Sequence, residues 1–484
     1  MFIISGIGEK NMITLGTAGF RGIDGKDFNE KVVQIVAQSA CNIMKNNNLK
    51  KEVVIGFDKR LHSRFYAHTV CRVLVANKIK TILCPFSEPS PLVSFVTKER
   101  ANDIGLMITS SHNPYIYNGI KIFGQGGKDI SNQMEDDFNK EVNCIKPNDI
   151  KIISWQQCKN NPLFSLQNFE EEYVNSIISQ IKHIPQSVNA IFETMGGSSY
   201  RCAKLLSKKL DKNKIYVTNI NTITKKIPSA PIPIEENLGH LAELIKKHNC
   251  KFAFATDGDG DRLAVVSPNG KYYNATELAP LIYSFAVRHK GEKGGLVCNK
   301  SFSALGDLVC KILNKNYYTC DIGYKNIENL MAQKKTNFGA ENSSLCLKNH
   351  APTKDGLLSF ALLLEVVSHI ENRDKTFDEI VSSLKEKCGY NFGYIEKTFP
   401  LNIANFEISL LKDFSPTLNK AIASKELFGQ NIKFIFSDNS FIMIRKSGTE
   451  SVLRIIANLP ETEDIEGIIQ KTYCEIEEEL NKQK

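Results

Sequence analysis

The apolar run Ile104 to Ile108 stops abruptly in the turn-forming stretch Thr109 to Pro114, and this junction constrains the fold strongly. A short apolar run bounded by turn residues is typical of a buried strand. Ser111 is therefore expected in a loop at the end of a strand, and in open α/β sheets such loops line the crevice that binds ligands. This position suits a nucleophile. The alternative is a serine-rich turn that caps a helix, because serine and asparagine often bond to their own backbone.

Apolar runs and helical patterns alternate along the chain. Residues 29–46 and 63–77 have the apolar spacing of helices, whereas 53–56 and 81–84 are short runs typical of strands. Such alternation predicts parallel sheets covered by helices, which is an α/β fold.

The length of 484 residues is too great for one core, and favours three or four domains of roughly 100 to 200 residues each. A polar stretch at about residues 145–165 is expected to be the first linker. We predict four domains, of which the last mixes strands with helices: residues 1–155, 166–270, 271–385 and 390–484.

The composition, with 42% hydrophobic and 24% charged residues, is that of an ordered globular protein. No apolar run reaches the roughly 18 residues of a membrane helix, and the first residues lack a basic leader, so we expect a cytoplasmic protein without a membrane partner. The 13 cysteines form no C-x-x-C pair, which argues against a disulfide framework. The net charge of +8 comes from lysines without interleaved aromatics. This pattern disfavours a nucleic-acid partner and suits a phosphorylated substrate.

Glycines surround Arg21 in the stretch Gly16 to Gly22. Glycine lets backbone N–H groups approach an anion, and the guanidinium of Arg21 is a planar donor fork suited to phosphate. A plain glycine turn is the alternative.

Three carboxylates alternate with glycines directly after the apolar strand 252–256, at Asp257, Asp259 and Asp261. Such a turn can fold back so that its oxygens converge on one hard cation, as all-oxygen ligation of Mg²⁺ requires. Without a cation the three charges would repel one another. The alternative is an acidic turn that caps a helix, although an apolar strand, 263–266, follows at once. An EF-hand is excluded because its last glutamate is missing.

Another strand, 441–444, runs into a basic loop that is rich in hydroxyls. Guanidinium groups, hydroxyls and an approachable glycine N–H are the parts of a phosphate-binding loop, with a basic turn as the alternative. The residues expected to bind a substrate phosphate are Arg445, Ser447, Gly448, Thr449 and Arg454.

The chain resembles the α-D-phosphohexomutases over nearly its whole length, on three motifs: T-S-S-H-N-P (109–114), D-G-D-G-D-R (257–262) and R-K-S-G-T-E (445–450). This superfamily contains phosphoglucomutase, phosphomannomutase and phosphoglucosamine mutase. The resemblance implies three α/β domains with mixed sheets and a C-terminal α+β domain around a central cleft. It also implies that Ser111 carries the transferred phosphoryl group, and that Mg²⁺ bridges the serine phosphate and the three aspartates.

The resemblance gives further residues a role in catalysis. Arg21 would lie beside the phosphoserine, Arg262 would contact it, and His112 belongs to the same motif as Ser111. Lys121, in the segment N-G-I-K, becomes the candidate for proton transfer. A lysine acts as a base only if burial or nearby cations depress its pKa, and a surface strand lysine is the alternative.

The sugar-binding loop of the family resembles residues 338–343, in which Glu341 and Ser343 would bind sugar hydroxyls. Ala340 replaces the usual glycine, and Ser344-Leu345 stand where many members have Gly-His, so the role of that histidine is left open; His350 does not align with it. Two lysines that follow strands are additional candidates: Lys300 and Lys325.

The implied activity is an intramolecular phosphotransferase that interconverts hexose 1-phosphate and hexose 6-phosphate through a bisphosphorylated sugar. Segments 322–327 and 350–358 look like glucomutase and mannomutase members, so glucose and mannose phosphates are the expected substrates. Phosphoglucosamine mutase is the alternative, because 111–124 looks like that branch. An inactive phosphosugar-binding regulatory protein is a third hypothesis, suggested by the altered sugar loop. Either a monomer or a dimer is compatible with the sequence.

Overall fold

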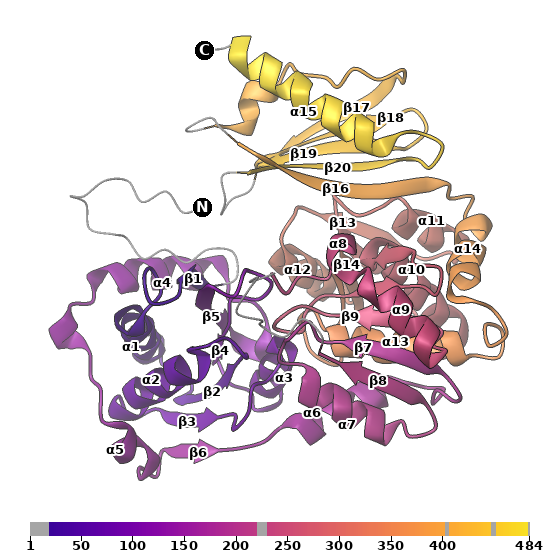
Figure 1. The fold of residues 1–484 in the computed structure, drawn as a ribbon. Coiled ribbons are helices and arrows are strands. Elements are labelled where there is room, and N and C mark those ends of the chain that lie inside the picture. Colours follow the sequence, from indigo (N-terminus) through magenta and orange to yellow (C-terminus); the bar gives the residue numbers. More distant parts are fainter. Residues whose placement is uncertain (1–18, 220–229, 402–405, 447–451, 483–484) are drawn as a thin grey trace.

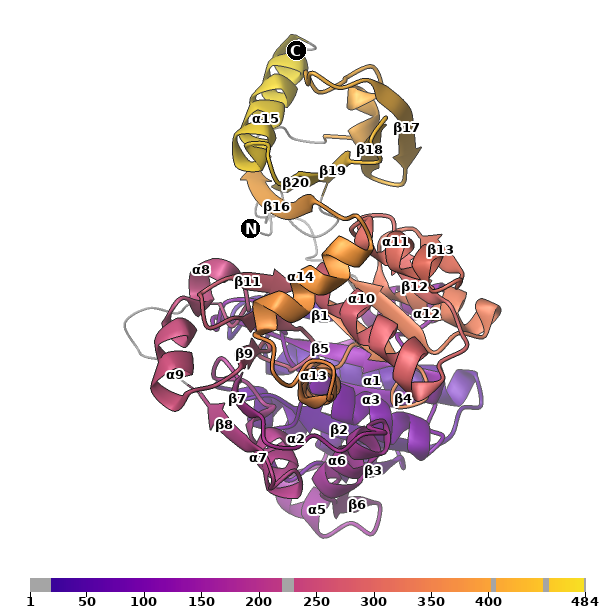
Figure 2. The ribbon, with the colours of Figure 1, turned by 90° about the vertical axis from the view of Figure 1, so that its right-hand side faces the viewer.

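The structure is a computed structural model, and it describes residues 19–219, 230–401, 406–446 and 452–482. The strands of the described residues form four separate sheets, and the fourth sheet stands apart above the other three (Figures 1 and 2). The first three sheets are mixed and covered by helices, whereas the fourth is antiparallel, so the predicted four-domain fold is confirmed. No described helix is both long and apolar enough to span a membrane.

In the first domain the described strands lie in the order β1-β5-β4-β2-β3-β6. Strands β2, β3, β4 and β6 run parallel, and β5 turns back antiparallel between β4 and β1. The elements are β1 (Phe20–Ile23), α1 (Glu30–Asn46), β2 (Glu52–Phe57), α2 (Ser63–Ala76), β3 (Lys80–Leu83), α3 (Ser90–Glu99), β4 (Ile104–Ile108), β5 (Tyr117–Phe123), α4 (Asn132–Cys144), α5 (Trp155–Lys159) and β6 (Phe164–Leu166).

The prediction of a first linker at about residues 145–165 is partly wrong. Residues 164–166 form β6, which pairs with β3 at the edge of the first sheet. Trp155 lies against this edge, stacked on His68 at 3.9 Å between ring centroids and 5.4 Å from Phe164. A three-residue strand within a polar stretch is too short to show a period of two, so the sequence pattern did not reveal it.

The second and third domains also consist of a mixed sheet covered by helices. The second sheet has the order β11-β10-β9-β7-β8 and the third has the order β13-β12-β14-β15. The second domain contains α6 (Glu170–Ser179), β7 (Asn189–Glu193), α7 (Tyr200–Lys209), β8 (Lys214–Thr218), α8 (Glu235–Leu238), α9 (His240–His248), β9 (Phe252–Ala255), β10 (Ala264–Val266) and β11 (Tyr272–Asn274). The third contains α10 (Ala275–Phe285), a π-helical turn η3 (Ala286–Lys290), β12 (Leu296–Asn299), α11 (Leu305–Ile312), β13 (Tyr317–Cys320), α12 (Tyr324–Lys334), β14 (Phe338–Glu341), β15 (Ser344–Leu347), α13 (Gly356–Ser368) and α14 (Phe377–Lys387).

These two domains share one hydrophobic core, which also receives one face of α3 from the first domain. Phe360 of α13 lies 5.0 Å from Phe192 of β7 and 5.5 Å from Phe254 of β9, measured between ring centroids. On the other side of this core, Phe95 of α3 lies 5.9 Å from Tyr173 of α6. A shared core of this kind holds the loops at the strand ends of three domains in fixed relative positions.

The fourth domain has its own core between an antiparallel sheet and one helix. Its elements are β16 (Phe392–Pro400), β17 (Ile422–Phe428), β18 (Asn431–Phe436), β19 (Phe441–Lys446), β20 (Val452–Pro460) and α15 (Ile465–Lys482). Polar contacts join it to the third domain: Lys385 Nζ lies 2.7 Å from Glu461 and 3.1 Å from Glu277, and the Ala304 N–H donates to Asn458.

Candidate active site

Ser111 lies in the loop that follows β4, where the sequence predicted it. Its backbone has a φ of 51°, a left-handed conformation that costs free energy for a residue with a side chain and is often found at active sites. The backbone N–H of Ser111 donates to Thr109 Oγ1 at 2.8 Å, and its Oγ donates to Asp257 Oδ2 at 3.0 Å. The strained turn thus directs the serine hydroxyl at the aspartate loop of the second domain.

Arg60 holds the serine loop through its backbone, a role that the sequence did not suggest. The buried guanidinium donates to four carbonyl oxygens at 2.7 to 2.9 Å, those of Ser111, Asn113, Pro114 and Tyr117. Its Nε donates to Asp58 Oδ2 at 3.1 Å, and Asp58 also accepts from the hydroxyl of Thr109. In the sequence, Asp58 and Arg60 simply follow β2, and these residue types do not reveal the contacts with the carbonyls.

The aspartate loop joins β9 to β10 and folds back on itself. Gly260 has a φ of +78°, and a Cβ at this position would lie 2.1 Å from Ser199 Oγ, so only glycine fits the turn. One oxygen each of Asp257, Asp259 and Asp261 lie within 4.8 Å of one another. Among the described residues, Oδ1 of Asp259 and Oδ1 of Asp261 are buried and accept no hydrogen bond. Buried carboxylate oxygens that converge without donors fit a divalent cation with oxygen ligands.

The electrostatics of the three carboxylates also fit a cation. Burial, together with the charges of Asp259 and Asp261, raises the pKa of Asp257 well above its ordinary value. Burial also opposes the ionisation of Asp261, but Lys354, Lys121 and Arg262 hold the pKa of that carboxyl below its ordinary value. Besides burial, the raised pKa of Asp257 reflects repulsion between neighbouring buried carboxylates, which a bound Mg²⁺ would offset.

Two lysines meet at Asp261. Lys121 Nζ of β5 lies 3.1 Å and Lys354 Nζ lies 3.7 Å from Asp261 Oδ2. Burial alone would lower the pKa of Lys121, but Asp261 and Asp259 raise it above its ordinary value. The two carboxylates therefore favour the ammonium form of Lys121 at this position.

Arg262 and His112 contact each other beside Ser111. Arg262 Nη2 lies 2.8 Å from His112 Nδ1, and this ring nitrogen is 3.3 Å from Ser111 Oγ. Burial and the neighbouring cations Arg262 and Arg21 lower the pKa of His112 well below its ordinary value, so the imidazole is neutral. Arg21 of β1 is half-buried, and desolvation lowers its pKa although Asp259 and Asp261 oppose the change. Gly16 to Ala18, the other part of the predicted glycine loop, lie outside the described residues.

The predicted sugar loop lies beside the aspartate loop. Glu341 ends β14, and its Oε1 accepts from Ser343 Oγ at 2.9 Å and from Lys354 Nζ at 3.0 Å. Burial works against ionisation, but Lys354 and Ser343 lower the pKa of Glu341. Ser344, one of the departures from the family pattern, donates from Oγ to the carbonyl of Asp261. The altered residue therefore ties the sugar loop to the aspartate loop.

His350 does not replace the missing histidine of the sugar loop. It is fully buried, with Nε2 3.0 Å from Asp355 Oδ2 and Nδ1 2.8 Å from the hydroxyl of Ser176. These partners belong to the core between the second and third domains. Among the described residues, Lys354 is the group that contacts both Glu341 and Asp261, and the sequence did not assign it a role.

The predicted phosphate loop begins at a pair of facing arginines. Arg445 of β19 is the cross-strand partner of Arg454 of β20. Burial, and then the charge of Arg454, lower the pKa of Arg445. Like charges directly opposite each other destabilise a sheet unless an anion lies between them, as a substrate phosphate would. Ser447, Gly448 and Thr449 lie outside the described residues.

A series of polar contacts runs from the serine to these arginines through loops of all four domains. It passes from Ser111 to the aspartate loop, and from Asp261 through Lys354 to Glu341. The neighbouring Asn342 donates to Glu396, whose other oxygen is 4.0 Å from Arg454 Nε. The sequence-predicted residues that this series links are Ser111, Asp257, Asp261, Glu341 and Arg454.

The two additional lysine candidates make contacts between domains instead. Lys300 Nζ lies 2.9 Å from Asp321 and 4.2 Å from the ring centroid of Phe428 in the fourth domain. Lys325 Nζ lies 2.8 Å from Glu135 of α4 in the first domain.

This architecture and these loops define a phosphohexomutase, an enzyme of the intramolecular phosphotransferase class. The chain belongs to the phosphoglucomutase/phosphomannomutase family, whose models for the α/β/α domains I, II and III match residues 12–149, 171–270 and 274–388. Similar curated proteins include the phosphoglucosamine mutases of Psychromonas ingrahamii, 24% identical over 93% of this chain and 96% of that protein, and of Campylobacter lari, 26% identical over 92% and 94%.

Solved structures show the same fold. A phosphoglucomutase/phosphomannomutase family protein from Burkholderia thailandensis has a TM-score of 0.78 and 18% identity over 96% of both chains. The N-acetylphosphoglucosamine mutase of Aspergillus fumigatus, in complex with GlcNAc-6P and magnesium, has a TM-score of 0.59 and 12% identity over 97% of this chain and 96% of that one. The superfamily depends on Mg²⁺, and the aspartate triad of this chain offers a fitting set of ligands.

Proposed function

We propose that Ser111, when phosphorylated, transfers its phosphoryl group to a hexose monophosphate, and that the bisphosphorylated sugar returns its other phosphoryl group to Ser111. The observation that carries this proposal is the contact of 3.0 Å between Ser111 Oγ and Asp257, in a triad whose other members have buried oxygens without donors. Asp257, Asp259 and Asp261 would hold Mg²⁺, which neutralises charge on the transferring oxygens when bound.

Other residues would transfer the proton and bind the phosphate groups. In each half-reaction the bond between phosphorus and the donor oxygen breaks, a bond to the acceptor oxygen forms, and one proton moves from the acceptor to the donor. Lys121, an ammonium in this structure, would give its proton to the leaving oxygen and take that of the attacking hydroxyl. Arg262, which lies beside His112, would bind the serine phosphate, and Arg445 with Arg454 would bind the phosphate that is not transferred.

The sugar is a hexose phosphate, and glucosamine 1-phosphate and 6-phosphate are the first pair to test. The similarity to phosphoglucosamine mutases along more than nine-tenths of the chain supports this choice. The expected glucose and mannose phosphates are the second candidates, supported by segments 322–327 and 350–358. A bisphosphorylated hexose would serve as both intermediate and activator.

A coupled assay of the purified protein with glucosamine, glucose and mannose 1-phosphates tests this proposal. We expect turnover that requires Mg²⁺ and a trace of the bisphosphorylated sugar, with the highest kcat/KM for one of the three. Turnover of none of them, together with binding of a phosphosugar, would favour an inactive regulatory protein instead.

A further inference from the structure

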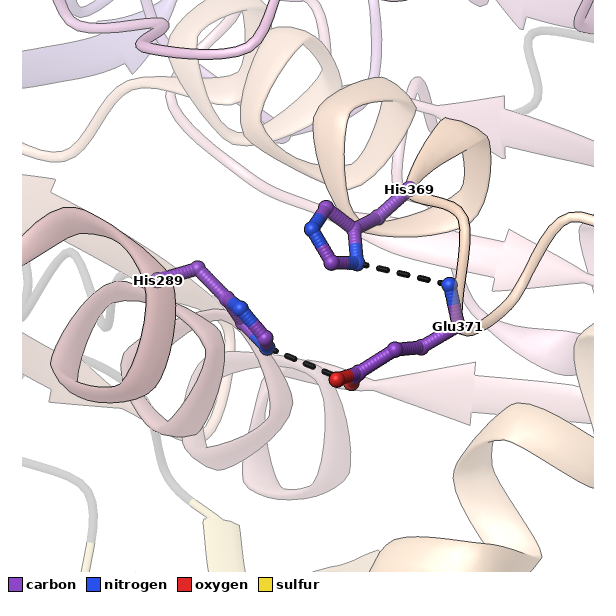
Figure 3. A group of neighbouring side chains, drawn as sticks. All are labelled: His289, His369 and Glu371. Carbon is purple, nitrogen blue, oxygen red and sulfur yellow. Dashed lines mark hydrogen bonds and ion pairs between the residues drawn. The ribbon is translucent and has the colours of Figure 1, made fainter.

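A second cluster of metal-ligating side chains lies at the surface, on elements that do not contribute to the active site. It consists of His289, His369 and Glu371, and one ligand atom of each lies within 4.8 Å of the others. Figure 3 shows the imidazole of His289 pointing toward the carboxylate of Glu371, with His369 beside them. The distance between His289 Nε2 and Glu371 Oε2 is 3.3 Å, and the two imidazole rings are 4.3 Å apart. We propose that this cluster, called the histidine site below, binds a transition-metal ion of the Zn²⁺ class.

Local backbone geometry brings the three ligands together. His289 lies in η3, the π-helical turn that ends α10, and such turns are rare and often mark functional positions. His369 caps the C-terminus of α13, and Glu371 follows two residues later. The backbone N–H of Glu371 donates to His369 Nδ1 at 3.5 Å, the long limit of a hydrogen bond, so a metal ion could replace this contact at little cost.

A buried ion pair fixes the backbone around the histidine site. Glu365 of α13 is fully buried and accepts from Lys290 Nζ at 2.8 Å, directly after His289 in the chain. The same carboxylate accepts from the backbone N–H groups of Lys182 and His183 at 2.8 and 2.7 Å. Glu365 thereby fixes the backbone next to His289 and brings the chain after α6 alongside, so that the ligands are held in position before a metal binds.

A third imidazole is close enough to complete the set. The ring of His183 lies 5.5 Å from that of His369, and its Nε2 is 3.4 Å from the carbonyl oxygen of His289. The side chain is exposed and so can turn toward the other ligands. Three imidazoles and one carboxylate, or two imidazoles, one carboxylate and one water, both give the four ligands of a tetrahedral zinc site.

The chemistry of these ligands selects a different ion from the aspartate triad. Burial and the nearby His289 and His183 lower the pKa of His369, which favours the neutral imidazole that a metal requires. Imidazole prefers Zn²⁺, Cu²⁺ and Ni²⁺, whereas the all-oxygen triad prefers Mg²⁺. A metal ion at the histidine site would also link α10 to the end of α13, and a metal that binds only the folded state stabilises it.

The simpler alternative is an ion pair between protonated His289 and Glu371 with no metal. Titration of the full-length protein with Zn²⁺ distinguishes a metal site from an ion pair without metal. Saturating Mg²⁺ is added to fill the proposed site at the aspartate triad. The background variant Cys144→Ser/Cys474→Ser removes the two exposed thiols, which could bind zinc themselves. Binding is followed by calorimetry, and by the visible spectrum of Co²⁺ as a substitute ion.

We expect one Zn²⁺ per chain and a Co²⁺ spectrum of nitrogen and oxygen ligands without thiolate bands. Loss of a residue that only hydrogen-bonds to a metal ligand weakens metal binding by at least about tenfold. His289→Ala and Glu371→Gln each remove a ligand itself and should weaken Zn²⁺ binding by more than this. His62→Ala is the matched control, because His62 also pairs with a carboxylate, Asp24 at 2.7 Å, and should bind zinc like the parent.

Absence of a bound Zn²⁺, or equal binding by His289→Ala, Glu371→Gln and the parent, would overturn the histidine site and leave only the ion pair. Glu371→Gln changes an exposed side chain, so a folding defect does not confuse its result. The readout is metal binding and not turnover, so the outcome is independent of the proposed mutase activity.

Discussion

The Nη2 atom of Arg60 lies 2.7 Å from the backbone carbonyl oxygen of Ser111, and the same guanidinium binds three more carbonyls of the serine loop. Ser111 has a left-handed backbone, so its turn is kept only where neighbouring groups hold it. Arg60 provides such support from the adjacent strand end, and its own charge is balanced by Asp58.

Arg60→Ala should therefore lower the free energy of unfolding by about 3 to 5 kcal/mol, because it leaves the buried charge of Asp58 without its cation. The loss can be measured by denaturant unfolding. The control is Lys59→Ala, which removes a half-buried neighbour whose ammonium lies 5.0 Å from the ring centroid of Tyr200 and should cost only about 0.5 to 1 kcal/mol. Equal effects of the two variants would contradict the role of Arg60.

The parts of the site that sequence reasoning found are those in which one short stretch carries the chemistry. The strand 104–108 has the predicted bounds, and Ser111 and the three aspartates follow strands as expected. Each of these motifs combines an apolar run with residues that end it, and both signals are local.

The parts that were missed depend on contacts between distant stretches. Arg60 binds backbone carbonyls, which leave no trace in the residue types around them. Lys354 meets Glu341 within its domain and Asp261 from another one. The raised pKa of Lys121 depends on Asp261 and Asp259, two carboxylates more than a hundred residues away in the chain. Such interactions become visible only when the domains are packed together.

Lys121→Met should lower turnover and, at the same time, strengthen the binding of Mg²⁺. The ammonium lies 3.1 Å from Asp261, one of the expected metal ligands, and so repels a cation at this site. Two unit charges about 4 Å apart interact by about 4 kcal/mol at an effective dielectric constant of 20, so a gain of at least about 1 kcal/mol is expected. Calorimetry with Mg²⁺ measures it. Lys325→Met, which breaks the pair with Glu135, is the control and should leave the affinity unchanged; weaker Mg²⁺ binding by Lys121→Met would argue against the aspartate triad as the metal site.

Glu341→Gln and Arg445→Ala should differ in their kinetics, because the first residue belongs to the sugar loop and the second to the phosphate loop. Glu341→Gln is expected to change the preference among glucosamine, glucose and mannose phosphates. Arg445→Ala should raise KM for every phosphosugar by an amount equivalent to about 1.5 to 3 kcal/mol, the contribution of a charged hydrogen bond. Steady-state kinetics with each sugar distinguish the two. An effect of Arg445→Ala on one sugar alone would show that the loops are misassigned.

Glu88 makes the stability of the fold dependent on pH. Burial, together with the charge of Glu170, raises the pKa of Glu88 from 4.5 to about 9, and its Oε1 has no partner among the described residues. The folded protein thus holds a proton that the unfolded chain releases above pH 4.5, so stability is lost as the pH rises from 4.5 toward 9. Glutamine does not titrate, so Glu88→Gln should not lose this stability. The difference in unfolding free energy between Glu88→Gln and the parent should therefore grow in favour of the variant as the pH rises from 4.5 toward 9. Parallel pH profiles of the two proteins would refute the assignment.

The central claim is that Ser111 carries the phosphoryl group between the two positions of the sugar, and mass spectrometry tests it most directly. The protein is incubated with a hexose 1,6-bisphosphate and Mg²⁺, digested, and then compared with a sample that was chased with hexose monophosphate. We predict one phosphoryl group on the peptide that contains Ser111, its loss during the chase with formation of bisphosphorylated sugar, and neither event in Ser111→Ala. Label on another residue, or turnover by Ser111→Ala equal to that of the parent, would contradict the account.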